Sequence, residues 1–127
     1  MEALTVQDLV AEAKKDIVEI EVSKVPAVLA EAAALLVDVR EADEYQQGYI
    51  KGALNIPRGV LEFRASPSYP GAVPELASKS TPIILYCRSG ARSALAAKAL
   101  GLLGYKSVVS MAGGFMAWEV AQLPIEK

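Results

Sequence analysis

Histidine is absent from this 127-residue chain, and cysteine occurs only once, as Cys87. Without histidine, the chain lacks the commonest general base and every histidine-based metal site. A single cysteine can form neither an internal disulfide nor a thiolate cluster for zinc, so the fold does not need an oxidising compartment. We therefore expect no bound metal.

Strong charge and long apolar runs are also missing. The 13 basic and 15 acidic residues give a net formal charge of −2, which provides no general attraction to nucleic acid or anionic membranes. The longest apolar stretches, such as Ala32–Val37, are too short to span a bilayer. The first ten residues are acidic and lack the pattern of a secretory signal. We expect a soluble, cytoplasmic protein with no nucleic-acid or membrane partner.

The chain alternates between strand-like and helix-like segments, which is typical of an α/β fold with a mainly parallel sheet and helices on both faces. A length of 127 residues fits one domain. The expected strands are residues 17–22, 35–39, 53–57, 82–86 and 107–111. The expected helices are one capped by Thr5, one from Ser23 to about Ala34, one over 41–48, short ones within 58–80, one over 92–103 and a last one ended by Pro124. Gly101 lies inside the expected helix over 92–103 and suggests close packing there. Trp118 is expected in the core.

The single cysteine lies where the apolar strand 82–86 ends, in the segment "CRSGAR". A helix N-terminus and neighbouring arginines favour the reactive thiolate form of a cysteine. Gly90 allows a positive φ, which can turn successive N–H groups toward one centre and make an anion site. Arg88 and Arg92 add forked donors that suit tetrahedral oxyanions. These features predict a thiolate at the bottom of an anion-binding cup, exposed enough to be easily oxidised.

Each of these residues also has a structural interpretation. A lone cysteine at a strand end is usually a small buried hydrophobe, but here a glycine and two arginines lie within five residues of it. Arg92 would brace the loop if it paired with Asp38, and Arg40 and Glu44 have the spacing of a helical ion pair. Ser93 either adds a hydroxyl donor or caps the helix. Gly113–Gly114 indicates a turn rather than a phosphate loop.

Two long segments resemble the rhodanese-like domain family. "LLVDVREADEYQQGYIKGALNIP" is similar to its first half, and "IILYCRSGARSALAAKALGLLGYKSVVSMAGGFMAWEVAQLP" is similar to its second half. The resemblance covers about Leu35 to Pro124 and extends more loosely back to Ile17. It implies a rhodanese-like three-layer fold over residues 17–127, preceded by a helical extension or lead-in over residues 1–16.

The resemblance implies a sulfurtransferase in which Cys87 takes a sulfane sulfur from an anionic donor such as thiosulfate and becomes a persulfide. A thiol, protein-borne or small, or cyanide would then accept that sulfur, and no organic cofactor is implied. Carried over by position, the substrate-binding loop consists of Arg88, Ser89, Gly90, Ala91 and Arg92. The supporting residues are Asp38 and Arg40 from the "DVR" element, with Ser93 behind the loop. Gly52, Ala53 and Asn55 fall on a structural "GA.N" strand.

One position departs from the family pattern. The family often has Gly-His-Ile where this chain has Gly48-Tyr49-Ile50. Because that histidine usually lies away from the sulfur, we expect altered packing rather than lost activity.

Three other functions remain open. Phosphatases and arsenate reductases of this fold use a longer Cys-x5-Arg loop, whereas Cys87 and Arg92 give Cys-x4-Arg, a narrower cup without an obvious general acid. A non-catalytic binding module would typically have lost the cysteine. A persulfide carrier for a protein partner would differ only in its acceptor, and residues 1–16 would then be a docking element.

Overall fold

Five parallel strands form the centre of the fold, which the computed structural model describes for residues 2–127. Their order across the sheet is β1-β5-β4-β2-β3, and every pair of neighbours is parallel. The strands are β1 Val18–Ile20, β2 Leu35–Asp38, β3 Leu54–Asn55, β4 Ile83–Tyr86 and β5 Val108–Met111. Each lies within the segment expected from the sequence, although β1 and β3 are shorter than expected. The expected α/β fold with a parallel sheet of about five strands is confirmed.

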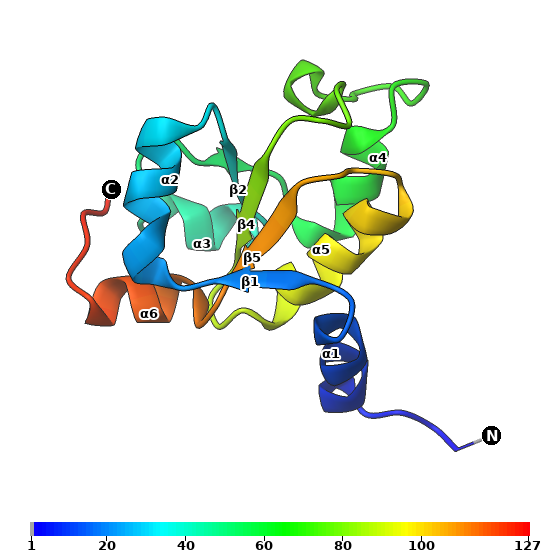
Figure 1. Cartoon of the computed structure of the whole chain (residues 1–127), viewed down its shortest axis with the longest axis horizontal. Helices are drawn as coiled ribbons and strands as arrows, with labels where there is room; N and C mark the ends of the chain where they lie inside the picture. Colours follow the sequence, from blue (N-terminus) through cyan, green and yellow to red (C-terminus); the bar gives the residue numbers. More distant parts are fainter. Residues whose placement is uncertain (1) are drawn as a thin grey trace.

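Helices cover both faces of this sheet (Figure 1). They are α1 Val6–Lys14, α2 Val25–Glu31, α3 Ala42–Gln46, α4 Leu61–Ala65, α5 Ala91–Leu102 and α6 Gly114–Val120. Short 3-10 turns lie at Val22–Lys24, Arg58–Val60 and Pro74–Leu76. Core residues from α4 and α5 pack on one face, and core residues from α2 and α6 pack on the other.

The strand β4 shows why this sheet is buried on both sides. Ile83 and Leu85 belong to the core under α4 and α5, whereas Ile84 and Tyr86 belong to the core under α2 and α6. All four side chains are at most 2 % exposed. A central parallel strand therefore reads as a continuous apolar run, and its carboxyl end is a fixed platform for the residue that follows, Cys87.

Three sequence expectations about the helices are wrong. Ser23 does not cap α2, because it lies within the 3-10 turn and makes no capping bond; the helix begins at Val25, with Pro26 in its first turn. Helix α6 ends at Val120, before Pro124, and the chain turns through Gln122 at φ 58°. Gly101 has open space around its Cα instead of a close neighbour. Trp118, by contrast, is in the core as expected, at 3 % exposed.

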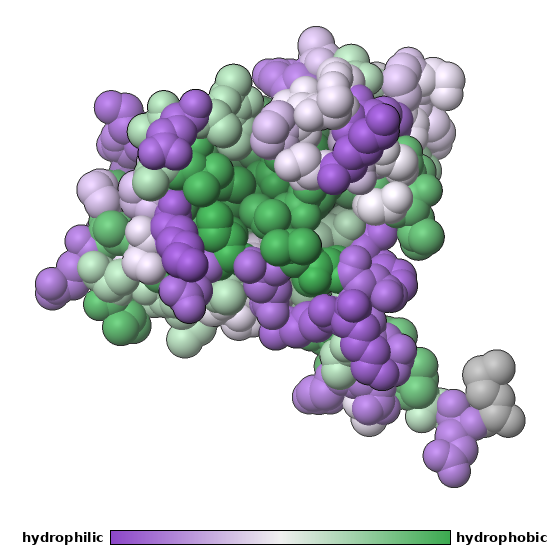
Figure 2. All heavy atoms as spheres, viewed as in Figure 1, coloured by the Kyte–Doolittle hydropathy of each residue, from purple (hydrophilic) through white to green (hydrophobic). Residues whose placement is uncertain are grey.

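Helix α1 begins as the sequence predicts and projects from the body beside α5 (Figure 1). The Thr5 side chain accepts a hydrogen bond from the Asp8 N–H, and the Asp8 carboxylate accepts one from the Thr5 N–H, which completes a capping box. The adjoining strand β1 is at the edge of the sheet, where Val18 is 62 % exposed. Figure 2 shows apolar side chains gathered over this edge. Its short length and the charged Glu19 are features that limit edge-to-edge association.

Candidate functional site

Cys87 follows β4 directly, at the edge of the sheet where the carboxyl ends of the strands meet. Its Sγ accepts hydrogen bonds from two backbone N–H groups, that of Gly90 at 3.1 Å and that of Ser93 at 3.4 Å. Gly90 has a φ of 97° and precedes the first residue of α5, so the loop curls over the sulfur in the way that its glycine predicts. Two donors therefore converge on Sγ, an arrangement that favours negative charge on the sulfur.

The expectation of an exposed thiolate is wrong. Cys87 has no exposed surface, because the backbone of residues 88–92 wraps over it and its side chain also packs in the core under α5. Because burial limits the access of oxidants to a sulfur, easy oxidation is not expected of Cys87 in this conformation.

A pair of serine hydroxyls lies behind the sulfur. The Ser93 Oγ is 3.6 Å from Cys87 Sγ and 2.8 Å from the Oγ of Ser110 on β5. Both serines are fully buried. Sequence reasoning named Ser93 but missed Ser110; the signal available was a hydroxyl residue near the carboxyl end of an otherwise apolar strand.

The N-terminus of α6 is hydrogen-bonded to the backbone of the cysteine loop. The N–H of Phe115 donates to the Cys87 carbonyl at 2.8 Å, and that of Met116 donates to the Arg88 carbonyl at 3.0 Å. A Cβ on Gly114 would lie 2.5 Å from the Arg88 carbonyl oxygen. The Gly113–Gly114 pair is a turn, as expected, but its contact with the cysteine loop was not foreseen. The sequence signal for this contact is the pair of glycines that follows β5, because β5 and β4 end at the same edge of the sheet.

Asp38 and Arg40 form a buried ion pair at the end of β2. Arg40 Nη2 lies 2.7 Å from Asp38 Oδ2, and Arg40 Nε lies 3.0 Å from both carboxylate oxygens. The expected pairing of Arg40 with Glu44 is therefore wrong. Burial by itself would lower the pKa of Arg40, but the hydrogen bonds and charge of Asp38 raise it overall, so the guanidinium stays cationic.

This ion pair is held from two further sides. Arg40 Nη2 also donates to the Gly48 carbonyl at 2.7 Å, and its guanidinium carbon lies 4.4 Å from the centroid of the Phe115 ring. Asn55 Nδ2 donates to the carbonyls of Asp38 and Arg40, each at 3.0 Å, which agrees with a structural role for the "GA.N" segment.

The sequence predicts that Arg92 pairs with Asp38, but in the structure it pairs with Glu44. The two guanidinium nitrogens of Arg92 donate to the two oxygens of Glu44 at 2.8 and 3.0 Å. Asp38 is not free for Arg92 because Arg40 occupies it. The hydrogen bonds from Arg92 lower the pKa of Glu44 to about 2. Arg92 therefore ties the first turn of α5 to α3.

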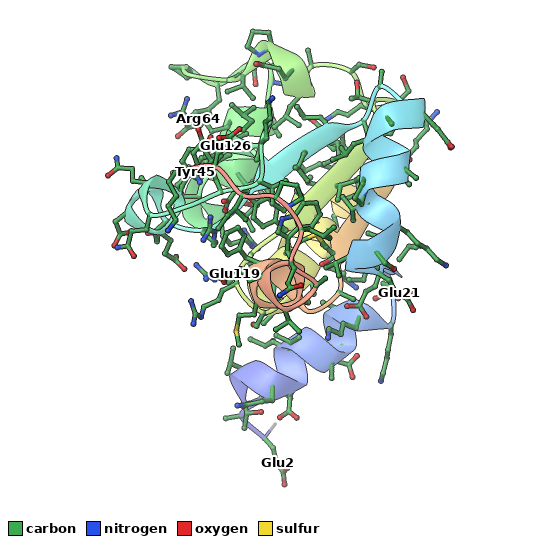
Figure 3. The ribbon with its side chains drawn as sticks, turned by 90° about the vertical axis from the view of Figure 1, so that its left-hand side faces the viewer. Glu2, Glu21, Tyr45, Arg64, Glu119 and Glu126 are labelled. Carbon is green, nitrogen blue, oxygen red and sulfur yellow. The ribbon has the colours of Figure 1, made fainter. Side chains whose placement is uncertain are left out.

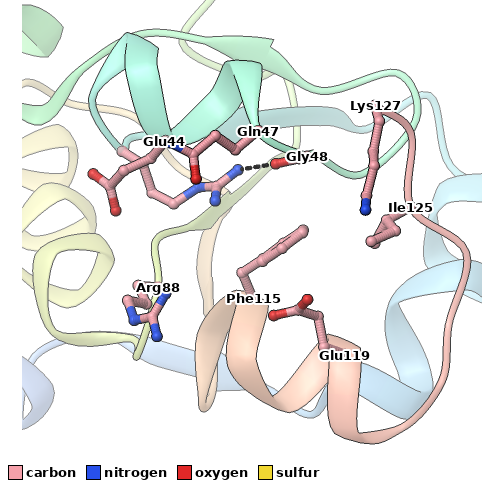
Figure 4. A pocket seen from close by; sticks show the side chains of 9 residues that line it. Glu44, Gln47, Gly48, Arg88, Phe115, Glu119, Ile125 and Lys127 are labelled. Atoms are coloured by element: carbon pink, nitrogen blue, oxygen red, sulfur yellow. Dashed lines mark hydrogen bonds between the residues drawn. The ribbon is translucent and has the colours of Figure 1, made fainter.

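The remaining loop residues lie on the surface. Arg88 and Ser89 are exposed, and neither side chain makes a hydrogen bond or ion pair to any of residues 2–127. Arg88 borders a pocket of about 210 Å³ that is also lined by Glu44 and Phe115 (Figure 4). Ala91 borders a separate groove of about 380 Å³ along α1. The structure therefore brings all the residues expected at the site to one edge of the sheet. Among its three arginines, Arg88 is the one without an ion pair to any of residues 2–127.

Tyr49 packs on Tyr45 and pairs with the C-terminal segment. Its ring stacks on Tyr45 with centroids 4.2 Å apart, and its backbone pairs with that of Glu126. In Figure 3 the labelled Tyr45 and Glu126 mark this region, away from the start of α1 at Glu2. Tyr49 therefore packs near the C-terminal segment.

The side chains and helix lengths of residues 2–127 bear on two other possibilities, a metal site and a membrane span. No cluster of three or more metal-ligating side chains is present in this part of the chain. Within the same residues, no helix has the length and apolar character needed to cross a bilayer.

The sequence model of the rhodanese-like domain matches residues 21–121. The chain belongs to the rhodanese-like domain family. A sulfurtransferase of Allochromatium vinosum is 40% identical over 91 residues, which cover 72% of this chain and 77% of that protein. Thiosulfate sulfurtransferase 18 of Arabidopsis thaliana is 31% identical over 119 residues, which cover 87% of this chain and 85% of that one.

A solved structure from Rhodopseudomonas palustris is similar along nearly its whole length. It has a TM-score of 0.91 and 33% sequence identity, and the match covers 99% of this chain and 97% of that one. That protein is of unknown function and is described as a possible tyrosine phosphatase. The similarity to that structure therefore includes the segment that carries α1.

Proposed function

We propose that this chain is a sulfurtransferase that moves a sulfane sulfur from thiosulfate, or a similar anionic donor, to a thiol or to cyanide. The observation that carries the proposal is the convergence of the Gly90 and Ser93 N–H groups on Cys87 Sγ. The relatives named as sulfurtransferases support the reaction class.

In the first half-reaction, the Cys87 thiolate attacks the outer sulfur of thiosulfate. An S–S bond forms between Sγ and that sulfur, and the bond from the outer sulfur to the sulfonate sulfur breaks. Sulfite leaves with the bonding electron pair, so the step is thiol–disulfide-like exchange and needs no oxidant. Sulfite is a good anionic leaving group and needs little help from an acid, so a site without histidine suffices.

In the second half-reaction, the acceptor attacks the outer sulfur of the Cys87 persulfide. The new bond joins the acceptor to that sulfur, and Sγ leaves as a thiolate, which restores the starting enzyme. The N–H groups of the loop stabilise the anion at each stage. Arg88 is the free cation for the incoming oxyanion, whereas Arg92 braces the loop through Glu44.

The geometry favours sulfur transfer over phosphate-ester hydrolysis. Phosphatases need an arginine whose fork is free to hold the phosphate oxygens, but here both terminal nitrogens of Arg92 are bound to Glu44. The Cys-x4-Arg loop is also one residue shorter than the phosphatase loop. The possible phosphatase function given for the Rhodopseudomonas protein is therefore the weaker candidate for this chain.

The deciding experiment is intact-protein mass spectrometry after incubation with thiosulfate and then with cyanide. We expect a gain of one sulfur atom, which must be on Cys87 because the chain has no other cysteine, and then its loss with release of thiocyanate. The Cys87→Ser variant should fold and gain nothing. If the reduced, folded protein gains no sulfur from thiosulfate or other sulfane donors, while it hydrolyses p-nitrophenyl phosphate, the phosphatase function replaces this one.

A second candidate is sulfur delivery to a protein thiol, with residues 1–16 as a docking extension to the domain over residues 17–127. The groove along α1 supports it, because Val6, Val10 and Ala11 line a hollow that ends at Ala91 of the loop. We expect Val6→Ser to slow transfer to a protein probe such as reduced thioredoxin and to leave transfer to cyanide unchanged. Leu4→Ser is the matched control, since Leu4 is equally exposed but does not line the groove. Equal effects of both variants would argue against docking here.

A further inference from the structure

The pocket of about 210 Å³ is lined by Arg88 of the cysteine loop, whereas Cys87 itself is not among its lining residues. It lies between α3 and α6, and Figure 4 shows the side chains of Arg88, Glu119 and Lys127 around it, with the Phe115 ring as a wall. Its volume is below that of pockets for drug-sized ligands. It therefore suits a metabolite with few heavy atoms.

Arg40 forms the floor of this pocket and has an unused donor group. The residue is 95 % buried, since its exposed fraction is 5 %. Its Nε and Nη2 are bound to Asp38 and Gly48, but its Nη1 donates to none of residues 2–127. Nη1 is not sealed off either, because the one fully buried side-chain polar atom without a partner in that range is Arg58 Nε. The pocket is the open space that Arg40 lines.

This donor is already oriented for an anion. Two hydrogen-bonded nitrogens and the Phe115 ring at 4.4 Å fix the plane of the guanidinium. A fixed guanidinium loses little entropy when it binds a carboxylate. Arg88 forms no ion pair with any of residues 2–127, whereas the charge of Arg40 is offset by Asp38. Glu44 and Glu119 also line the pocket with Lys127, and Glu44 is already paired with Arg92.

We propose that this pocket binds the carboxylate of a small organic thiol that accepts sulfur from Cys87. The inference rests on the proposed function and names the class of acceptor. The carboxylate lies against Arg40 Nη1 and Arg88, the short carbon chain lies on the Phe115 ring, and the thiolate reaches the loop past Arg88, the residue that follows Cys87. The thiolate bonds to the outer persulfide sulfur, the bond from that sulfur to Sγ breaks, and Sγ leaves with the electron pair.

Adjacent glutamines offer a matched test. Gln47 lines the pocket and is exposed at the end of α3, whereas Gln46 is also exposed but does not line it. With thiosulfate as donor, kcat/KM is measured for 3-mercaptopropionate, which carries a carboxylate, and for 2-mercaptoethanol, which is neutral. The ratio of the two values cancels any effect of a variant on folding or on sulfur loading.

Gln47→Glu should lower this ratio about fivefold and Gln47→Lys should raise it by a similar factor, from the Coulomb energy of one charge at close range near a protein surface. Both effects should shrink at high salt. Gln46→Glu should leave the ratio within about twofold of wild type, because its charge is farther away and better solvated.

Three results would overturn the inference. One is an unchanged ratio in both Gln47 variants while cyanide turnover continues. Another is an equal change of the ratio in Gln46→Glu, which would indicate a long-range electrostatic effect on the charged thiol and not its binding in the pocket. A third is a Gln47→Glu variant with a raised KM for thiosulfate and an unchanged ratio, which would assign the pocket to the donor. Absence of turnover with cyanide in the wild-type protein would instead refute the proposed function, and this inference with it.

Discussion

Arg92 at the start of α5 and Glu44 on α3 are joined by two parallel hydrogen bonds, of 2.8 and 3.0 Å, although they are 48 residues apart in the chain. This pair connects the helix that follows the cysteine loop to the segment that follows β2. Glu44 also accepts a hydrogen bond from the Glu41 N–H at 3.0 Å, so the carboxylate is held by its own helix as well. The helix turn that follows the loop over Cys87 is thus held to α3 by this pair.

The Arg92–Glu44 pair, called the brace below, should make the free energy of unfolding depend on pH under acidic conditions. The pKa of Glu44 falls from 4.5 to about 2 on folding, so its contribution is fully present above about pH 4.5 and is lost as the pH falls toward 2. We expect Glu44→Gln to lower the free energy of unfolding by about 1 kcal/mol at neutral pH, because Glu44 and Arg92 are both partly exposed. The variant should lose less stability than wild type between about pH 5 and pH 3.

Urea denaturation of both proteins across this pH range measures the effect. Glu31→Gln serves as the control, because Glu31 is exposed on α2 and forms no ion pair with any of residues 2–127. If wild type and Glu44→Gln lost stability in parallel on acidification, the brace would not be a source of the pH dependence.

The two ion pairs also show what sequence reasoning can and cannot reach. The sequence predicts that Asp38 lies near the cysteine loop and Arg92, because carboxyl ends of parallel strands converge at one sheet edge, and that Arg40 has the spacing to pair with Glu44. It predicts the wrong partners, since the pairing depends on burial: Asp38 and Arg40 are sealed together at the end of β2, which leaves Glu44 for Arg92. Which of several carboxylates an arginine selects is a property of packing that spacing along the chain does not contain.

The same distinction applies to the fold. Apolar runs and turn residues place every strand, since burial on both faces leaves a strong signal. Helix ends are less predictable: α6 stops at Val120 by a local turn, although Pro124 seemed the natural terminator. The contact of Gly114 with the cysteine loop was also missed, because a glycine that is needed for close approach looks the same as one needed for a turn.

Gly114→Ala should disrupt both the fold and the site. The added Cβ would lie 2.5 Å from the Arg88 carbonyl oxygen, and the backbone φ of 61° is unfavourable for alanine. We expect a loss of about 2–4 kcal/mol of unfolding free energy and slower sulfur loading from thiosulfate, because α6 must move off the loop. Denaturation and mass spectrometry measure the two effects. A variant with native stability and native loading would show that the contact is dispensable.

Gly101→Ala is expected to act in the opposite direction. Gly101 lies inside α5, has an ordinary helical φ and has open space within 4 Å of the new Cβ. Alanine in a helix interior is favoured over glycine by about 0.5–1 kcal/mol, so the midpoint of urea denaturation should rise. Sulfur loading should not change, since Gly101 is at the far end of the helix from Cys87. A lower midpoint would mean that the added methyl group at position 101 meets a neighbouring group and that this face of α5 is not open.

Ser110→Ala tests the hydroxyl pair behind the sulfur. The Ser110 hydroxyl is hydrogen-bonded to that of Ser93, which in turn lies by Cys87 Sγ, so Ser110 is a positioning residue that orients the Ser93 hydroxyl. Its removal leaves a buried hydroxyl with one partner fewer, at a cost of about 1 kcal/mol in stability, and should lower kcat/KM for thiosulfate several-fold. Ser93→Ala should lower it by at least as much. Because both act through one hydrogen bond, the double variant should be no worse than Ser93→Ala alone. Additive losses in this double-mutant cycle would mean that the two serines act independently, and that the 2.8 Å contact between them does not contribute to turnover.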